Sequence, residues 1–221
     1  MPARRIVRAY IGLGANVGDA AATLAGAVVS LDDLAAVRVR GVSRLYATEP
    51  WGVTDQPEFR NAAVALDITV LGADPAAAAL VLLGRLKTLE RAAGRRRRRR
   101  WGPRELDLDL LVFGQHQISV ERPAEAGSID AETDPAKAAK RLEIPHRDLG
   151  ERLFVLAPLA DLAPRLVPPG WSETVDTRRR RLAATEPPGI VRVVGMWDPR
   201  RRAWSRARDS TAATLKPRAA L

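Results

Sequence analysis

The chain has 221 residues, 46% of them hydrophobic, which is enough for one domain with a sizeable core and an extension. It contains no cysteine, and this excludes disulfides and thiolate metal sites. No apolar run approaches the roughly 20 residues of a membrane-spanning helix, and no signal-peptide pattern follows Met1. We therefore expect a soluble, cytoplasmic protein without a membrane partner. The formal net charge of +10 attracts polyanions, but composition does not choose among nucleic acid, acidic membrane and phosphorylated small molecules.

The pattern of apolar residues predicts four strands and two long helices. The strands are expected at residues 5–13, 37–47, 59–70 and 105–113. Asp19 is placed to cap a helix after the first strand, and Asp74 followed by Pro75 starts a second helix that ends near residue 92. The order β-α-β-β-α-β is that of an α+β ferredoxin-like sandwich, in which helices cover one face of a mainly antiparallel sheet.

The second half of the chain is less regular. Residues 121–140 are rich in Pro, Ala and Glu and predict a polar surface insertion. A short helix is expected around residues 153–161 and a strand at 190–194. These patterns divide the chain into a domain over residues 1–175 and a basic C-terminal extension over residues 176–221.

Two acidic residues stand out on the fourth predicted strand. Asp107 and Asp109 lie two residues apart, so their carboxylates point to the same side with alpha carbons about 6–7 Å apart. The opposite, buried side is predicted to hold the alternating residues Leu106, Leu108, Leu110 and Val112. Two adjacent carboxylates repel each other unless a hard cation binds them, as Mg²⁺ does in phosphoryl-transfer sites. An isolated pair of this kind is more often two solvated acids on an exposed strand.

A run of six arginines, Arg95 to Arg100, precedes the acid pair, and Arg104 lies between the two. Guanidinium groups bind phosphate oxygens in a bidentate way. Alone, the run indicates a solvated cluster or a nonspecific polyanion site. Next to the acid pair it favours a site for a triphosphate.

The glycine-rich segment from Gly12 to Gly18 is not a nucleotide-binding loop of either common type. Val17 stands where G-x-G-x-x-G requires glycine, and no G-x-x-x-x-G-K-[ST] motif occurs. We interpret the segment as a tight turn between strand and helix, with Asn16 as a candidate site-lining residue.

Phe59 and Asn61 are candidates for binding a flat heterocycle. They lie two residues apart at the start of the third predicted strand and so face the same side. An aromatic face for stacking and an amide for a donor–acceptor edge suit such a ligand. Core packing of Phe59 and turn capping by Asn61 explain the two residues equally well.

These motifs, in this order, resemble the 6-hydroxymethyl-7,8-dihydropterin pyrophosphokinase family. The matching stretches are residues 10–19, 43–66, 89–114 and 144–164, and the most specific part is Arg-Trp-Gly-Pro-Arg-Glu-Leu-Asp-Leu-Asp at residues 100–109. The resemblance implies a ferredoxin-like enzyme of folate biosynthesis that transfers the pyrophosphoryl group of ATP to the hydroxymethyl group of the pterin and releases AMP. It also implies two magnesium ions held by Asp107 and Asp109.

The resemblance further implies roles for individual residues. Arg95 and Arg104 are the implied catalytic arginines on a loop that closes over the phosphates, with Arg96 and Arg97 as alternatives to Arg95. The residues implied to contact ATP or support its site are Lys87, Glu90, Arg100, Trp101, Arg141, His146 and Arg152. The residues implied to line the pterin pocket are Thr48, Pro50, Trp51, Phe59, Asn61 and Phe154. Arg122 is an alternative to Arg141. We favour Arg141 because its sequence spacing to His146 is the one that the family pattern has.

Two other functions account for part of the sequence. A small basic RNA- or DNA-binding domain explains the charge but not the two acids next to the arginine run, so we expect no nucleic-acid partner. A different ATP-dependent kinase on the same fold explains the acids and arginines but not Phe59 and Asn61. The expected partners are therefore the substrates ATP and 6-hydroxymethyl-7,8-dihydropterin. The protein itself is expected to be a monomer.

Overall fold

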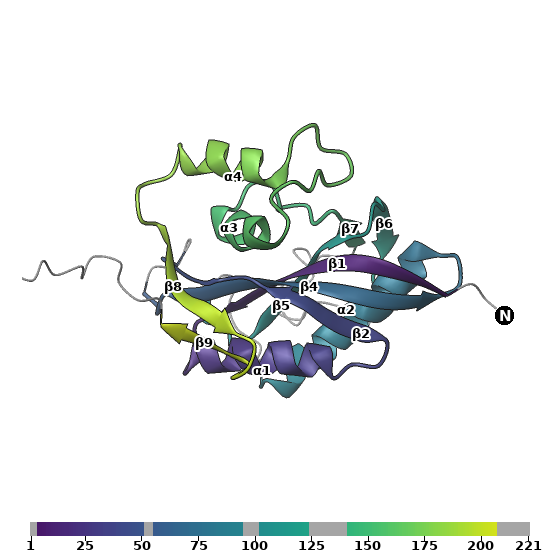
Figure 1. Cartoon of the computed structure of the whole chain (residues 1–221), viewed down its shortest axis with the longest axis horizontal. Coiled ribbons are helices and arrows are strands. Elements are labelled where there is room, and N and C mark those ends of the chain that lie inside the picture. Colours follow the sequence, from purple (N-terminus) through teal and green to yellow (C-terminus); the bar gives the residue numbers. More distant parts are fainter. Residues whose placement is uncertain (1–3, 51–54, 95–101, 124–140, 207–221) are drawn as a thin grey trace, which may run out of the picture.

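The computed structural model describes residues 4–50, 55–94, 102–123 and 141–206. These residues form a seven-stranded sheet, a two-stranded sheet and four helices (Figure 1). The strands are β1 (Arg4–Ala15), β2 (Val37–Val42), β3 (Leu45–Thr48), β4 (Phe59–Leu71), β5 (Asp107–Phe113), β6 (Ile118–Glu121), β7 (Arg141–Ile144), β8 (Val191–Asp198) and β9 (Ala203–Arg206). The helices are α1 (Ala20–Asp32), α2 (Pro75–Ala92), α3 (Leu153–Leu162) and α4 (Val175–Ala183).

The main sheet has the strand order β5-β1-β4-β3-β8-β9, and β2 also pairs with β4. All of its pairs are antiparallel, which confirms the predicted α+β class with a mainly antiparallel sheet. The strand predicted at residues 37–47 is in fact two strands, β2 and β3. The register of β2 with β4 shifts between Val39 and Gly41, and a bulge of this kind bends a strand away from its neighbour.

Helices cover both faces of the main sheet, with α3 and α4 on one side and α1 and α2 on the other (Figure 1). The sequence predicted helices on one face only. The difference arises because the sheet carries apolar residues on both sides. Ile11, Leu66 and Leu108 pack with α1 and α2 in the larger core, whereas Tyr10 and Leu111 pack with α3 in a smaller one.

The predicted helix starts are confirmed. The Asp19 side chain accepts a hydrogen bond from the backbone N–H of Ala22 at 3.0 Å, and that of Asp74 accepts one from Ala76 at 2.8 Å. The interpretation of Gly12 to Gly18 as a turn is only partly right. Gly12 and Gly14 lie inside β1, and only Gly18, with a φ of +61°, takes the left-handed conformation of a turn.

The predicted alternation of β5 holds from Leu106 to Leu110 and is wrong at Val112. The register with β1 shifts between Tyr10 and Ile11, so that Leu111 is an extra residue in β5. Leu111 and Val112 consequently belong to the core under α3, and Phe113 rejoins the larger core.

Part of the predicted C-terminal extension continues the main sheet. β8, which confirms the strand expected at 190–194, pairs with β3, and β9 pairs with β8. The indole N–H of Trp204 donates a hydrogen bond to the carbonyl oxygen of Ser43 at 2.9 Å, and its ring meets that of Trp197 edge-on at 4.7 Å. A division of the chain at residue 175 stays a prediction.

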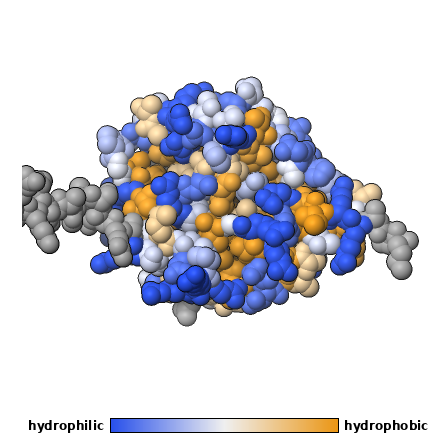
Figure 2. All heavy atoms as spheres, viewed as in Figure 1, coloured by the Kyte–Doolittle hydropathy of each residue, from blue (hydrophilic) through white to orange (hydrophobic). Residues whose placement is uncertain are grey.

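The face of the molecule drawn in Figure 2 is mixed, with hydrophilic residues around areas of apolar residues. Among the described residues, no helix combines the length and the apolar character that crossing a bilayer requires.

We predict that Trp204→Ala lowers the free energy of unfolding by about 2–3 kcal/mol, because it removes a half-buried aromatic ring and a hydrogen bond to Ser43, between β2 and β3. The exposed Met196 on β8 provides the control, since Met196→Ala should cost less than about 0.5 kcal/mol. Urea unfolding of both variants measures the difference. Equal, small losses would show that β9 contributes nothing to the stability of the sheet.

Candidate active site

A row of three residues crosses the middle of the main sheet. Asn61 on β4, Gly14 on β1 and Asp107 on β5 lie directly opposite one another. Two residues further along each strand, Gly12 lies between Ala63 and Asp109 in the same way. Directly opposite residues in an antiparallel sheet point to the same face. The two predicted metal ligands and the predicted pterin-binding amide therefore share one face, the face that α3 covers.

The absence of a side chain at Gly14 lets the side chains of Asn61 and Asp107 approach the backbone of β1. A Cβ atom added at Gly14 would lie 3.2 Å from Oδ1 of Asn61 and 4.0 Å from Cβ of Asp107. Two strand spacings separate Asn61 from Asp107, which amounts to about 10 Å.

The amide side of the row is built from β3 and β4. The Asn61 side chain donates a hydrogen bond to Oγ1 of Thr48 at 2.7 Å, and both residues are buried. Phe59 lies opposite Thr48, is half-buried and belongs to neither core cluster. These positions disfavour core packing for Phe59 and turn capping for Asn61, and they leave both free to contact a ligand.

The acid side of the row is surrounded by cationic groups. The guanidinium of Arg104 forms an ion pair with Asp107. Arg122 lies within electrostatic reach of Asp109, whose charge raises the pKa of Arg122, although burial has the larger effect and holds that pKa below its ordinary value. Both acids thus have a cationic group near them, by contact for Asp107 and by electrostatic interaction for Asp109.

The two candidate arginines differ in their contacts: Arg122 interacts electrostatically with Asp109, whereas the Arg141 side chain is bonded to Ser119. The Arg141 side chain donates to Oγ of Ser119 at 3.1 Å and to the Ser119 carbonyl at 2.7 Å. Arg122 donates to the Arg141 carbonyl at 3.0 Å and interacts with the charges of Asp109 and Glu90. The preference for Arg141, which rested on sequence spacing to His146, thus gains no support from the hydrogen bonds of its side chain.

His146 and Arg152 lie in one connected turn beside β5. The backbone N–H of His146 donates to the Leu111 carbonyl at 2.9 Å, and its Nδ1 accepts from the backbone of Asp148. Asp148 in turn pairs with Arg152, whose guanidinium lies 5.9 Å from the centre of the Phe154 ring. The turn therefore brings three of the predicted site residues to the face of the acid pair.

Lys87 and Glu90 hold the strand that carries the acids. The Lys87 ammonium pairs with Oε1 of Glu90 at 2.7 Å, and both side chains are buried. The Leu108 N–H donates to the same Glu90 oxygen at 2.7 Å, and the Leu108 carbonyl accepts from Lys87 at 3.3 Å. The pair thus satisfies the backbone between Asp107 and Asp109 at the edge of β5 and fixes the direction of both acids.

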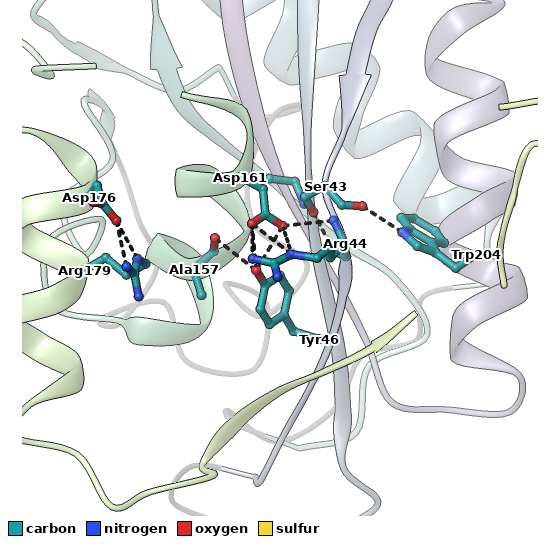
Figure 3. Close-up of polar contacts among 9 residues, drawn as sticks. Ser43, Arg44, Tyr46, Ala157, Asp161, Asp176, Arg179 and Trp204 are labelled. Atoms are coloured by element: carbon teal, nitrogen blue, oxygen red, sulfur yellow. Dashed lines mark hydrogen bonds and ion pairs between the residues drawn. The ribbon is translucent and has the colours of Figure 1, made fainter. Parts of the chain in front are cut away.

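A second polar cluster anchors α3 over the site (Figure 3). Asp161 accepts hydrogen bonds from the Arg44 guanidinium at 3.0 Å and from the Tyr46 hydroxyl at 2.9 Å. Burial and the neighbouring carboxylate raise the pKa of Tyr46, so the hydroxyl remains a donor. The cluster ties α3 to β3 and thereby positions Arg152 and Phe154 at the start of α3.

Several predicted residues are not placed. Trp51, Arg95, Arg100 and Trp101 lie outside the described residues, and Pro50 is the last residue described before Trp51. Sequence reasoning missed the role of Gly14. The signal was that Gly12 and Gly14 stand two residues apart, so that one face of a continuing strand lacks side chains at both positions.

The described fold is an α+β antiparallel sheet that carries two acids, an amide and basic groups on one face. Residues 10–164 match the model of the family described as 7,8-dihydro-6-hydroxymethylpterin-pyrophosphokinase, and the chain belongs to this family. Membership indicates an enzyme, a transferase that carries a pyrophosphoryl group to hydroxymethyldihydropterin in folate synthesis.

Named relatives agree with this assignment. The chain is 44% identical over 190 residues to the 2-amino-4-hydroxy-6-hydroxymethyldihydropteridine pyrophosphokinase of Methylorubrum extorquens. The aligned region covers 85% of this chain and 99% of the relative. The enzyme of the same name from Pseudomonas aeruginosa is 36% identical over 86% of this chain and 99% of its own length.

A solved structure supports the fold. The crystal structure of Plasmodium falciparum HPPK-DHPS wild type with pteroate matches with a TM-score of 0.64 at 13% identity and covers 93% of this chain. The match spans about half of that longer chain, 48%.

We predict that Glu90→Gln lowers the free energy of unfolding by about 3 kcal/mol or more, because it leaves the buried Lys87 ammonium without a counter-charge. The half-exposed pair of Arg147 and Glu143 is the control, and Glu143→Gln should cost less than about 1 kcal/mol. Chemical denaturation measures both. A Glu90→Gln variant as stable as Glu143→Gln would contradict the role of the buried pair.

Proposed function

We propose that the row from Asn61 through Gly14 to Asp107 is the place where pyrophosphoryl transfer occurs. The observation that carries this proposal is that the amide and the acids face the same side of three adjacent strands with only glycine between them. The pterin would lie on the Asn61 side with its hydroxymethyl group directed towards Asp107. The phosphates of ATP would lie at the acid end.

The pterin is recognised by stacking and by hydrogen bonds in this proposal. Phe59 and Phe154 supply aromatic faces, and Pro50 and Trp51 complete the pocket by family resemblance. Asn61 directs its N–H to Thr48, and the described residues offer its Oδ1 no hydrogen bond, so this oxygen is oriented to accept one from a heterocycle N–H.

Asp107 and Asp109 fit the two magnesium ions that we propose. Both supply carboxylate oxygens to one face, and no group of three acidic or histidine side chains among the described residues forms a closed cage. Such a site leaves the remaining positions to phosphate oxygens and water, as Mg²⁺ prefers. When bound, the ions would neutralise phosphate charge and increase the acidity of the pterin hydroxyl.

The protein contributes positioning and charge in the transfer itself. The pterin hydroxyl oxygen bonds to the β-phosphorus while the bond from that phosphorus to the oxygen bridging to the α-phosphate breaks. AMP leaves with the bridging oxygen and its electron pair, and the hydroxyl proton is lost to solvent. Arg104, which pairs with Asp107, lies where its guanidinium can stabilise the charge on the transferred group, and Arg95 is the second arginine proposed by resemblance.

The ATP side of the site comprises residues with different tasks. His146, Arg122 and Arg152 are proposed to contact the nucleotide, together with Arg100 and Trp101 by resemblance. Lys87 and Glu90 are proposed to act by holding β5, since their polar atoms are bonded to Leu108.

We predict that Asp109→Asn reduces pterin-dependent AMP formation at least about 100-fold, equal to roughly 3 kcal/mol, because a metal-holding carboxylate is lost. AMP is measured from ATP and Mg²⁺ with and without 6-hydroxymethyl-7,8-dihydropterin. Asp67→Asn, which removes a carboxylate from the same face at a distant part of β4, is the control and should keep near wild-type turnover. Wild-type protein that forms no AMP would refute the activity, and an active Asp109→Asn variant would refute the metal site.

We further predict that Arg122→Ala raises the KM for ATP at least about 10-fold, because Arg122 lies at the charge of Asp109. Arg141→Ala should change it less than about threefold, since that side chain is engaged with Ser119. Steady-state kinetics of the two variants decide between the arginines. The reverse order of effects would restore Arg141 as the nucleotide contact.

Two finer proposals concern the state in which the chain works. We propose that it acts as a monomer, because one chain supplies both ends of the row between Asn61 and Asp107. We also propose that it acts in the cytoplasm, where ATP is available to it.

A further inference from the structure

The face of the main sheet that α3 covers continues beyond that helix. α3 packs over Tyr10 and Ala65, which lie opposite each other on β1 and β4. Residues two apart on a strand, and residues directly opposite one another, point to the same face. Three further rows on this face therefore lead to the start of β1: Arg8 with Asp67 and Arg38, Ile6 with Thr69, and Arg4 with Leu71. Figure 1 shows the sheet reaching past α3 to the end where the N-terminus is marked.

This end of the face carries a concentrated positive charge. Arg4, Arg8, Arg38 and Arg40 are all exposed. The single acid among them, Asp67, accepts a hydrogen bond from Nε of Arg8 at 2.7 Å and from Nε of Arg40 at 2.6 Å. Within the part of the chain that the structure describes, Arg4 and Arg38 have no ion-pair partner. Four guanidiniums around one carboxylate leave an excess of three positive charges.

Two exposed apolar side chains lie among these arginines. Ile6 and Leu71 are each 68% exposed. Leu71 lies opposite Arg4 and is thus a diagonal neighbour of Ile6, about 7–8 Å away, which is within reach of long side chains. Exposed apolar side chains with charged residues around them are typical of a surface that another molecule covers.

Charge and composition select the class of partner. A second copy is disfavoured, because a two-fold axis through this face would place arginines against arginines. Single-stranded nucleic acid stacks its bases on aromatic side chains, and the described residues of the three rows include none. A bilayer gains little from Ile6 and Leu71, which together have fewer carbons than one myristoyl chain, itself only a marginal anchor. A polypeptide can present carboxylates and apolar side chains on one segment.

We propose that this basic face, formed by Arg4, Ile6, Arg8, Arg38, Arg40 and Leu71, is a docking surface for an acidic segment of another protein. Carboxylates of the segment pair with the guanidiniums, and an apolar side chain packs on Ile6 and Leu71. Ile6 precedes Gly14 by eight residues on β1, which amounts to about 25 Å at the usual rise per residue. Docking therefore leaves the candidate active site open and does not depend on the reaction proposed for it.

A fluorescein-labelled synthetic peptide, Gly-Glu-Glu-Leu-Glu-Glu-Leu-Glu-Glu-Gly, is the probe. Its dissociation constant is measured by fluorescence anisotropy with the full chain at concentrations up to about 1 mM. We expect saturable binding that weakens as the salt concentration rises. Replacement of every glutamate by glutamine should weaken binding at least about tenfold, and replacement of both leucines by serine at least about threefold.

Two double variants test where the peptide binds. Arg4→Glu with Arg38→Glu reverses two charges of the basic face and should weaken peptide binding at least about tenfold. Arg200→Glu with Arg201→Glu is the matched control, because it reverses the same charge in the exposed turn between β8 and β9. The control should change the dissociation constant less than about threefold. Both variants should form AMP at the wild-type rate, since none of the four residues belongs to the candidate active site.

Three results would overturn the proposal: no binding of the glutamate peptide, equal binding of the glutamine peptide, or a double variant of the basic face that binds as wild type does. The two peptides are compared on unaltered protein, so they decide the matter even if that variant does not fold. A uridine oligonucleotide of about 20 nucleotides and phosphatidylcholine vesicles with about 20% phosphatidylserine probe the other classes. If either binds more tightly than the peptide and loses its binding in Arg4→Glu with Arg38→Glu, the face serves that class of partner and the proposal is wrong.

Discussion

The lack of a side chain at Gly14, which lets the Asn61 amide lie close to the backbone of β1, is the constraint on which the site depends. Three antiparallel strands bring Asn61 and Asp107 to the same face, and a side chain at the position between them would press on the Asn61 amide. Backbone pairing sets the separation of the two ends, at about two strand spacings. Under the proposed function, the sheet would supply a fixed distance between heterocycle and phosphate, and positioning is what pyrophosphoryl transfer requires most.

The remaining structure keeps the ends of the row in place. At the outer edge of β5, the buried Lys87–Glu90 pair forms hydrogen bonds to the backbone of Leu108, between the two acids. On the other face, Asp161 binds Arg44 and Tyr46 and anchors α3 to the sheet (Figure 3). A buried ion pair is costly when one partner is lost, so such devices specify geometry more than they add stability.

The sequence predicted the helix starts and most strands because the signals are local: Asp19 and Asp74 cap the turns that follow them. It also placed Asp107 and Asp109 together, since residues two apart on a strand share a face. It could not predict the bulge at Leu111, because register depends on the neighbouring strand. The same limit applies to Gly14, whose role depends on partners that are distant in sequence and meet only in the folded sheet.

Replacement of Gly14 by alanine tests the central claim most directly. Its Cβ would lie 3.2 Å from Oδ1 of Asn61, so the amide must shift. We predict at least about a tenfold fall in kcat/KM for pterin, roughly 1.4 kcal/mol, with little change in the unfolding midpoint. Gly26→Ala is the control, because nothing lies within 4 Å of its added Cβ on α1 and activity should be unchanged. A Gly14→Ala variant with wild-type kcat/KM for pterin would contradict the account.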